Sequence, residues 1–229
     1  MTFRSTTFVL DLDQAQHATT IAAVGKQMGL PDHAVTIALA AALQESQLHN
    51  LAHGDLDSLG LFQQRPSQGW GSAQQVMTPS YAARAFYEHL AQIAGWETLP
   101  VTVAAQRVQR SGAPDAYAAW ELEARGVAQA VTGEVPAGLT CRLVDPPSAA
   151  SIGQPLAPAV STELGAPALG APLAAPRGWT VASWLVGHAT EFGITSVAFD
   201  GRRWRAASGD WQPEPTAGTT LQFTRGPGA

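Results

Sequence analysis

One stretch of the chain limits the possible folds more than any other feature of the sequence. Between Pro146 and Arg177 it holds seven of the sixteen prolines and nine alanines, with only two charged residues. A segment of this composition is semi-extended and is not expected to bury a core. We therefore expect a Pro/Ala-rich linker over residues 136–177, between a larger domain at residues 8–135 and a smaller one at residues 178–225.

The larger domain has the apolar periodicity of helices. Apolar residues recur every three or four positions over residues 11–28, 31–46, 79–90, 102–110 and 114–131. Between them, residues 50–71 are rich in glycine and proline and have no periodicity, which predicts a long irregular segment. Long ordered loops in compact domains usually carry function. The expected class is therefore a mainly α domain with one functional loop.

The smaller domain is predicted to be α/β. Residues 179–193 have helical spacing, and residues 194–199 have the β-branched and aromatic content of a strand. Asp200-Gly201 is typical of a hairpin turn, and Trp204, Leu221 and Phe223 suggest further short strands. A domain of this size is marginal alone, so its tryptophans are expected in the core. These are Trp179, Trp184, Trp204 and Trp211. We expect an accessory or binding role for it.

Composition excludes several classes of protein. The net charge of -5 argues against a sequence-independent nucleic-acid binder, which neutralises phosphates with Lys and Arg. No apolar run approaches the ~18 residues of a membrane span. Cys141 is the only cysteine, so no internal disulfide forms. His49 and His53 lack a third ligand, and we expect neither a metal nor another cofactor. The first residues lack the pattern of a signal peptide.

The residues that indicate chemistry lie at the end of the second predicted helix and in the loop that follows. Glu45-Ser46 closes the apolar helix, and Gly60-Leu61-Phe62-Gln63 lies in the loop. A carboxyl at such a helix end, facing a glycine-rich loop, is partly desolvated, which raises its pKa and keeps it protonated. A protonated carboxyl can donate to the leaving oxygen of a glycosidic bond.

These two motifs resemble the goose-type lysozyme and soluble lytic transglycosylase family, whose signature is Glu-Ser at a helix end followed by Gly-Leu-Met-Gln. The resemblance covers residues 14 to about 131. The run from Asp57 to Gly71 is similar to that of an actinobacterial lysozyme-like subfamily of cell-envelope proteins. This resemblance implies a lysozyme-like fold for the first domain.

By this resemblance Glu45 is the catalytic acid, and in a transglycosylase also the base that accepts a proton from the sugar's own hydroxyl. Ser46 orients Glu45 or supports its helix, and Gln63 lines the glycan groove with the Gly60 and Leu61 backbone. Asp55 and Asp57 correspond to aspartates that position water in goose-type lysozymes, although an aspartate beside Ser and Gly is also ordinary loop chemistry.

The sequence departs from the family pattern twice. Asp57-Ser58 replaces the usual Gly-Ala, and the later Ala-Tyr-Asn motif has no clear counterpart. Gln109 is a candidate for the hydrogen bonds of the missing Asn, and Tyr117 or Tyr81 for the tyrosine that approaches the acid.

Two further loop residues have alternative roles. Gln64 either binds sugar hydroxyls or braces the loop, and Trp70 either stacks on a sugar ring or packs as a lid. The predicted substrate contacts are Ser46, Ser58, Gly60, Leu61, Gln63, Gln64, Trp70, Gln109 and Tyr117.

The expected function is cleavage of the β-1,4 bond of peptidoglycan glycan strands after N-acetylmuramic acid, by a monomeric, extracytoplasmic transglycosylase. Direct hydrolysis by a muramidase is one alternative. The other is an inactive lysozyme-like scaffold that binds glycan or an envelope or division protein.

Overall fold

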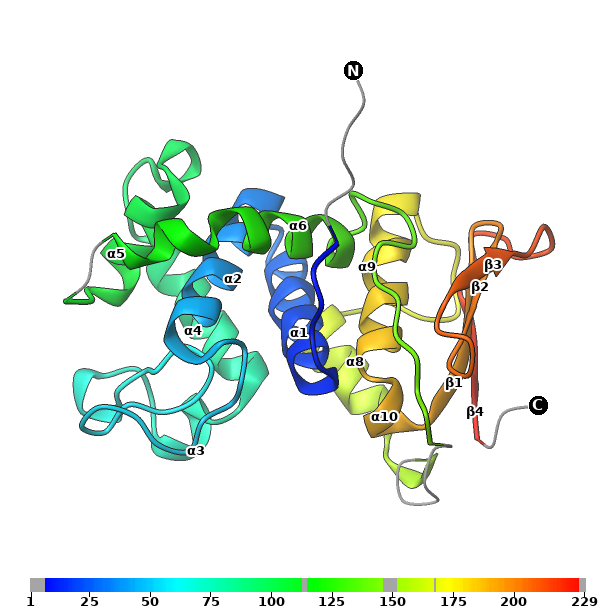
Figure 1. The fold of residues 1–229 in the computed structure, drawn as a ribbon, viewed down its shortest axis with the longest axis horizontal. Helices are drawn as coiled ribbons and strands as arrows, with labels where there is room; N and C mark the ends of the chain where they lie inside the picture. The colour runs from blue at the N-terminus through cyan, green and yellow to red at the C-terminus, as the bar shows by residue number, and fades with distance from the viewer. Residues whose placement is uncertain (1–6, 113–114, 146–151, 167, 227–229) are drawn as a thin grey trace. The chain divides into compact units, whose positions relative to one another are not determined.

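The computed structural model describes residues 7–112, 115–145, 152–166 and 168–226. The chain forms two compact units. The first comprises residues 7–21 and 29–128, and the second comprises residues 22–28 with the described residues after 128. The first unit is helical, and the second combines helices with a small antiparallel sheet (Figure 1). The predicted fold class, mainly helical with a small α/β part, is confirmed at this level.

The described helices up to residue 131 are α1 (Leu12–Gln27), α2 (Asp32–Ser46), α3 (Ala73–Val76), α4 (Pro79–Ala91), α5 (Val101–Gln109) and α6 (Glu121–Val131). Short 3-10 turns η1 (Pro66–Gln68), η2 (Trp96–Thr98) and η3 (Ala116–Trp120) lie between them. Helices α1, α2, α4 and α5 begin and end near the predicted positions, α3 was not predicted, and the helix predicted over 114–131 consists of η3 followed by α6. Asp11 and Gln14 exchange side-chain to backbone hydrogen bonds, which caps the start of α1.

Helix α2 is the central helix of the first unit. Every residue from Ala34 to Leu43 is buried, so the helix is surrounded by packed side chains. It contacts α4, α5 and η3. Its end is fixed by Gln47 and Leu48 in the left-handed conformation, whose backbone N–H groups donate to Leu43 and Ala42. The last turn of α2, with Glu45, is thereby held in place.

The second unit is built on a four-stranded antiparallel sheet with strand order β3-β2-β1-β4. The strands are β1 (Ile194–Phe199), β2 (Arg202–Arg205), β3 (Trp211–Pro213) and β4 (Gln222–Arg225). Helix α9 (Ala175–Gly187) packs on β1, and the short α10 (Ala189–Phe192) precedes that strand (Figure 1). The four tryptophans of this unit are all buried, which confirms that they belong to the core.

The predicted linker is corrected in part by the structure. Helix α8 (Leu156–Leu164) lies within it and places Leu156, Val160 and Leu164 in the core of the second unit. Upstream, the backbone carbonyls of Leu139 and Cys141 accept hydrogen bonds from the indole groups of Trp211 and Trp204. The expectation that residues 136–177 bury no core is therefore wrong for these segments. Residues 146–151 and 167 lie outside the described residues.

His188 lies in the core of the second unit. It is 2% exposed and stacks on Trp184 with the ring centroids 4.0 Å apart. Its Nε2 atom lies 3.8 Å from the carboxylate of Glu163, which also accepts a hydrogen bond from the Trp184 indole.

Among the described residues, no helix is long and apolar enough to cross a membrane.

Candidate functional site

Glu45 is held in the last turn of α2 by two side chains from the segment that follows α4. The Tyr117 hydroxyl donates a hydrogen bond of 2.5 Å to Oε1 of Glu45. Gln109, the last residue of α5, also forms a side-chain hydrogen bond with Glu45. Its Nε2 atom donates to the backbone carbonyl of Phe62, 2.8 Å away. Gln109 therefore connects the acid to the loop opposite.

Burial sets the acidity of this carboxyl group. Glu45 is half-buried, and desolvation raises its pKa, while the hydrogen bonds from Tyr117 and Gln109 lower it to a smaller extent. Burial raises the pKa of Tyr117, so its phenol keeps the proton that it donates. The result is a carboxyl with fixed orientation that keeps its proton to a higher pH than an exposed Glu.

The loop facing Glu45 is fastened to α2 by buried contacts. The Ser46 hydroxyl lies within hydrogen-bond distance of two carbonyl oxygens, at 2.7 Å from Leu61 and 3.1 Å from Ala42. The Gly60 N–H donates to Leu51 at 2.8 Å. Ser46 is 6% exposed and Leu61 is fully buried, so these side chains support the loop and do not line a cleft. Of the two roles expected for Ser46, its contacts fit the support of the helix and loop, because they reach Ala42 and Leu61.

Gly60 is a glycine for a steric reason. Its φ is +77°, which L side chains rarely adopt, and a Cβ atom there would lie 2.3 Å from the backbone carbonyl oxygen of Val76. The close approach allows the loop to pass against the segment that ends α3. Gly60 therefore contributes backbone geometry, and its place in the motif follows from packing.

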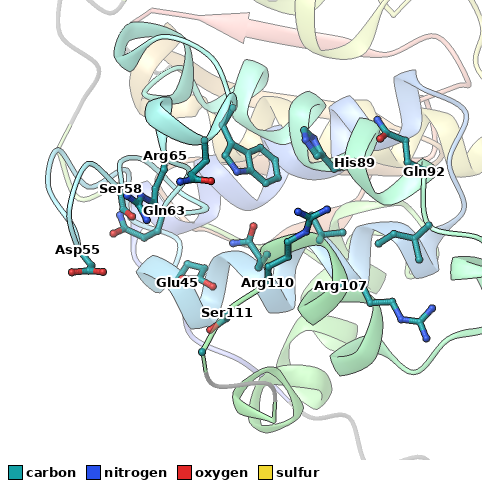
Figure 2. A pocket seen from close by; sticks show the side chains of 16 residues that line it. Glu45, Asp55, Ser58, Gln63, Arg65, His89, Gln92, Arg107, Arg110 and Ser111 are labelled. Carbon is teal, nitrogen blue, oxygen red and sulfur yellow. The ribbon is translucent and has the colours of Figure 1, made fainter.

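A cleft of about 810 Å³ opens in front of Glu45 within the first unit (Figure 2). The loop contributes Asp55, Ser58, Gln63, Arg65 and Trp70 to its lining. Helices α4 and α5, with the residues that cap their C-terminal ends, contribute His89, Gln92, Arg107, Gln109 and Arg110. Its lining is mostly polar, with cationic and amide groups around a single half-buried acid. A cleft of this volume and chemistry can accept a hydrated, hydroxyl-rich ligand.

The two neighbouring glutamines of the loop have different positions. Gln63 has a left-handed backbone with φ of 47° and lines the cleft, and its Nε2 atom donates to Gly60 at 3.2 Å. Gly54 leaves room for this side chain, because a Cβ atom there would lie 1.8 Å from Oε1 of Gln63. Gln64 is 1% exposed and donates to the Ala82 carbonyl. Of the two predicted roles, Gln64 has that of the brace.

The two loop aspartates also differ. Asp57 accepts hydrogen bonds from Arg65 Nε at 2.8 Å and from the Ser67 N–H and hydroxyl. These donors hold the pKa of Asp57 down at about 2. Its carboxylate fastens the loop and does not line the cleft, so the structure gives no support to a role in positioning water. Asp55 does line the cleft, at one end of it and apart from Glu45 in Figure 2.

Trp70 lines the cleft with its ring partly covered. The rings of Trp70 and His89 stack with centroids 4.0 Å apart, and Nδ1 of His89 lies 2.8 Å from the Ala85 carbonyl. One face of the indole is therefore packed on α4. Tyr81, the other tyrosine considered from the sequence, lies against Gly71. The tyrosine on Glu45 is Tyr117.

The structure brings six of the predicted residues to the cleft, namely Glu45, Asp55, Ser58, Gln63, Trp70 and Gln109. The others lie beneath it, as supports of the acid or of the loop. They are Ser46, Asp57, Gly60, Leu61, Gln64 and Tyr117. Apart from Gln109, sequence reasoning missed the lining from α4, α5 and the residues that cap them, which includes His89, Gln92, Arg107 and Arg110. Polar residues on a helix surface give no signal that they face a cleft.

Within the described part of the chain, no group of three or more His, Cys, Asp or Glu side chains is placed to hold a metal ion. No model of a known protein family matches the sequence, and a search among curated proteins finds no match.

Proposed function

We propose that this protein cleaves the β-1,4 bond between N-acetylmuramic acid and N-acetylglucosamine in peptidoglycan glycan strands, with Glu45 as the general acid and base. The observation that carries the proposal is the half-buried carboxyl at a polar cleft, held by Tyr117 and Gln109, with desolvation raising its pKa. General acid catalysis is most effective when the pKa of the acid lies near the working pH.

The proposed reaction is that of a lytic transglycosylase. Glu45 gives its proton to the glycosidic oxygen, and the bond to C1 of N-acetylmuramic acid breaks. The resulting carboxylate accepts the proton of the C6 hydroxyl of the same sugar as that oxygen bonds to C1. The products are an anhydro sugar end and a free hydroxyl end, and Glu45 is again protonated. The reaction uses no water molecule and needs no second carboxylate.

The arrangement of the aspartates favours this route over hydrolysis. A hydrolase that inverts needs a second carboxylate about 6.5–9.5 Å from the acid to activate water. Asp57 is occupied by Arg65 and Ser67, and Asp55 lies at one end of the cleft. The proposed substrate lies outside the cytoplasmic membrane, so the proposed location of the chain is extracytoplasmic.

Digestion of purified sacculi tests the proposal. Wild-type protein should release muropeptides that mass spectrometry finds one water lighter than hydrolysis products. Glu45→Gln should lower the rate at least about 100-fold, within the usual contribution of general acid–base catalysis. Glu97→Gln, at an exposed position in η2, is the matched control and should retain the wild-type rate.

Three results would change the proposal. Products of full mass would indicate a muramidase, and Asp55→Asn should then abolish them. Equal release by wild type and Glu45→Gln would overturn the catalytic role of Glu45. No release by either protein would favour a glycan-binding scaffold.

A further inference from the structure

The charged groups of the cleft are unequally distributed. Three arginines line it, together with the carboxyl groups of Glu45 and Asp55. Arg65 is paired with Asp57 through a contact of 2.8 Å. Arg107 and Arg110, in contrast, form no ion pair with any residue that the structure describes. Among the described residues, Arg107 and Arg110 are therefore the two cations of the cleft without an ion-pair partner.

Arg110 is the better placed of the two. It follows Gln109 directly and caps the C-terminal end of α5 with φ of 52°, so its backbone is fixed by the turn that also positions the Gln109 side chain at Glu45. Its N–H donates to Gln106 at 2.7 Å. Figure 2 shows its side chain directed toward His89, whereas the Arg107 side chain is directed away from Glu45 and His89.

The side chains that hold the acid are Tyr117 and Gln109, which hydrogen-bond to Glu45. Among the described residues, neither arginine forms an ion pair with Glu45. An arginine that is exposed, unpaired and part of a ligand cleft is suited to a ligand anion. The guanidinium group matches a carboxylate especially well, because two parallel N–H groups can bind its two oxygens.

We infer that the cleft selects carboxylate-bearing glycan strands, and that Arg110, with Arg107 farther along, is a specificity residue that binds this carboxylate. The inference rests on the proposed function and specifies the substrate class of the same site. A peptidoglycan strand offers two such carboxylates. A strand without peptides has the lactyl carboxylate of N-acetylmuramic acid, and a peptide-bearing strand has the carboxylates of its stem.

Binding measurements in the full-length Glu45→Gln protein separate recognition from cleavage. The three probes are peptide-bearing strands, strands stripped of peptides by an amidase, and the neutral hexamer of N-acetylglucosamine. The dissociation constant of each is measured by calorimetry at low salt and in 1 M salt. Arg110→Gln keeps most of the side-chain length and, like arginine, is an L residue with a Cβ atom in the left-handed backbone conformation. Arg110→Lys keeps the positive charge. Arg202→Gln, at an exposed position on β2, controls for loss of a positive charge.

At low salt, at least one carboxylate-bearing strand should bind more tightly than the hexamer. Arg110→Gln should weaken that binding about fivefold, as expected for one exposed charge pair, and leave the hexamer unchanged. Arg110→Lys should retain part of the preference, and Arg202→Gln all of it. In 1 M salt, where screening acts over about 3 Å, the preference should disappear. Whichever strand shows the larger loss identifies the lactyl or the stem carboxylate as the partner.

Equal binding of all three probes, an equal loss for all three in Arg110→Gln, or no binding of any probe would overturn the inference. The outcome is independent of catalysis. If the anionic strands bind selectively but wild-type protein releases nothing from sacculi, the proposed reaction fails and the recognition by Arg110 stands.

Discussion

Replacement of Gly60 by Ala tests whether the loop is held against the rest of the first unit as closely as its geometry indicates. At φ of +77° an L residue costs about 1–2 kcal/mol relative to glycine. The new Cβ atom would also lie 2.3 Å from the Val76 carbonyl oxygen, which is backbone and cannot rotate away. Overpacking of this kind costs about 1–3 kcal/mol, so Gly60→Ala should lose about 2–5 kcal/mol in total.

Gly95 provides a matched control for the backbone contribution. Its φ is +72°, and a Cβ atom there would meet nothing within 4 Å. Gly95→Ala should therefore lose only the first contribution, about 1–2 kcal/mol. Urea unfolding followed by circular dichroism measures both variants, and their difference isolates the steric contribution. If Gly60→Ala is no less stable than Gly95→Ala, the inference that the loop passes in close contact with the Val76 backbone is wrong.

Three further perturbations test other parts of the structure. The hydrogen bond from Tyr117 lowers the pKa of Glu45, so Tyr117→Phe should raise this pKa and move the basic limb of the pH–activity profile to higher pH. An unmoved limb would contradict this role for the tyrosine. Asp57→Asn should lower the melting temperature more at pH 7 than at pH 2. A carboxylate with pKa of about 2 gives its full contribution above its ordinary pKa of 3.8 and loses it as the pH falls through 2, so an equal loss at both pH values would contradict this role. Leu164→Ala should cost about 2–5 kcal/mol in thermal or urea unfolding, and a loss below about 1 kcal/mol would argue against α8 as a core element.

The elements of the first unit could be predicted because their signals are local. The apolar period of α2, with Pro31 at its start and Gly29 before it, fixes the helix within a residue or two of its observed bounds. The end of that helix is also where the motif places Glu45. Periodicity and capping act over a few residues, and a single sequence displays them directly.

The partners of Glu45 could not be fixed in this way. Tyr117 lies 72 residues downstream, and only the packing of α2 against α5 and η3 brings the two together. Spacing along the chain left Tyr81 as an equal candidate. The same holds for the pair Gln63 and Gln64, where one left-handed residue decides which amide reaches the cleft.

Helix α8 was missed because its composition concealed its period. Leu156, Val160 and Leu164 follow each other at four-residue intervals, which is a helical pattern. Pro155 and Pro158 suggest an extended chain instead. Proline is tolerated before a helix and in its first turn, where backbone N–H groups have no partner within the helix. The prolines therefore mark the start of this helix.

The seven tryptophans are divided between the two units, which decides what fluorescence can report. Trp179, Trp184, Trp204 and Trp211 are enclosed in the second unit, whereas Trp70 borders the cleft of the first and stacks on His89. Trp96 is also buried in the first unit, so a red shift of the emission on heating reports the opening of either unit. A molecule entering the cleft would instead alter the quenching of one indole by one imidazole, a small change on a bright background. Replacing the four enclosed rings is not an option, so a reporter for occupancy is better attached near the loop.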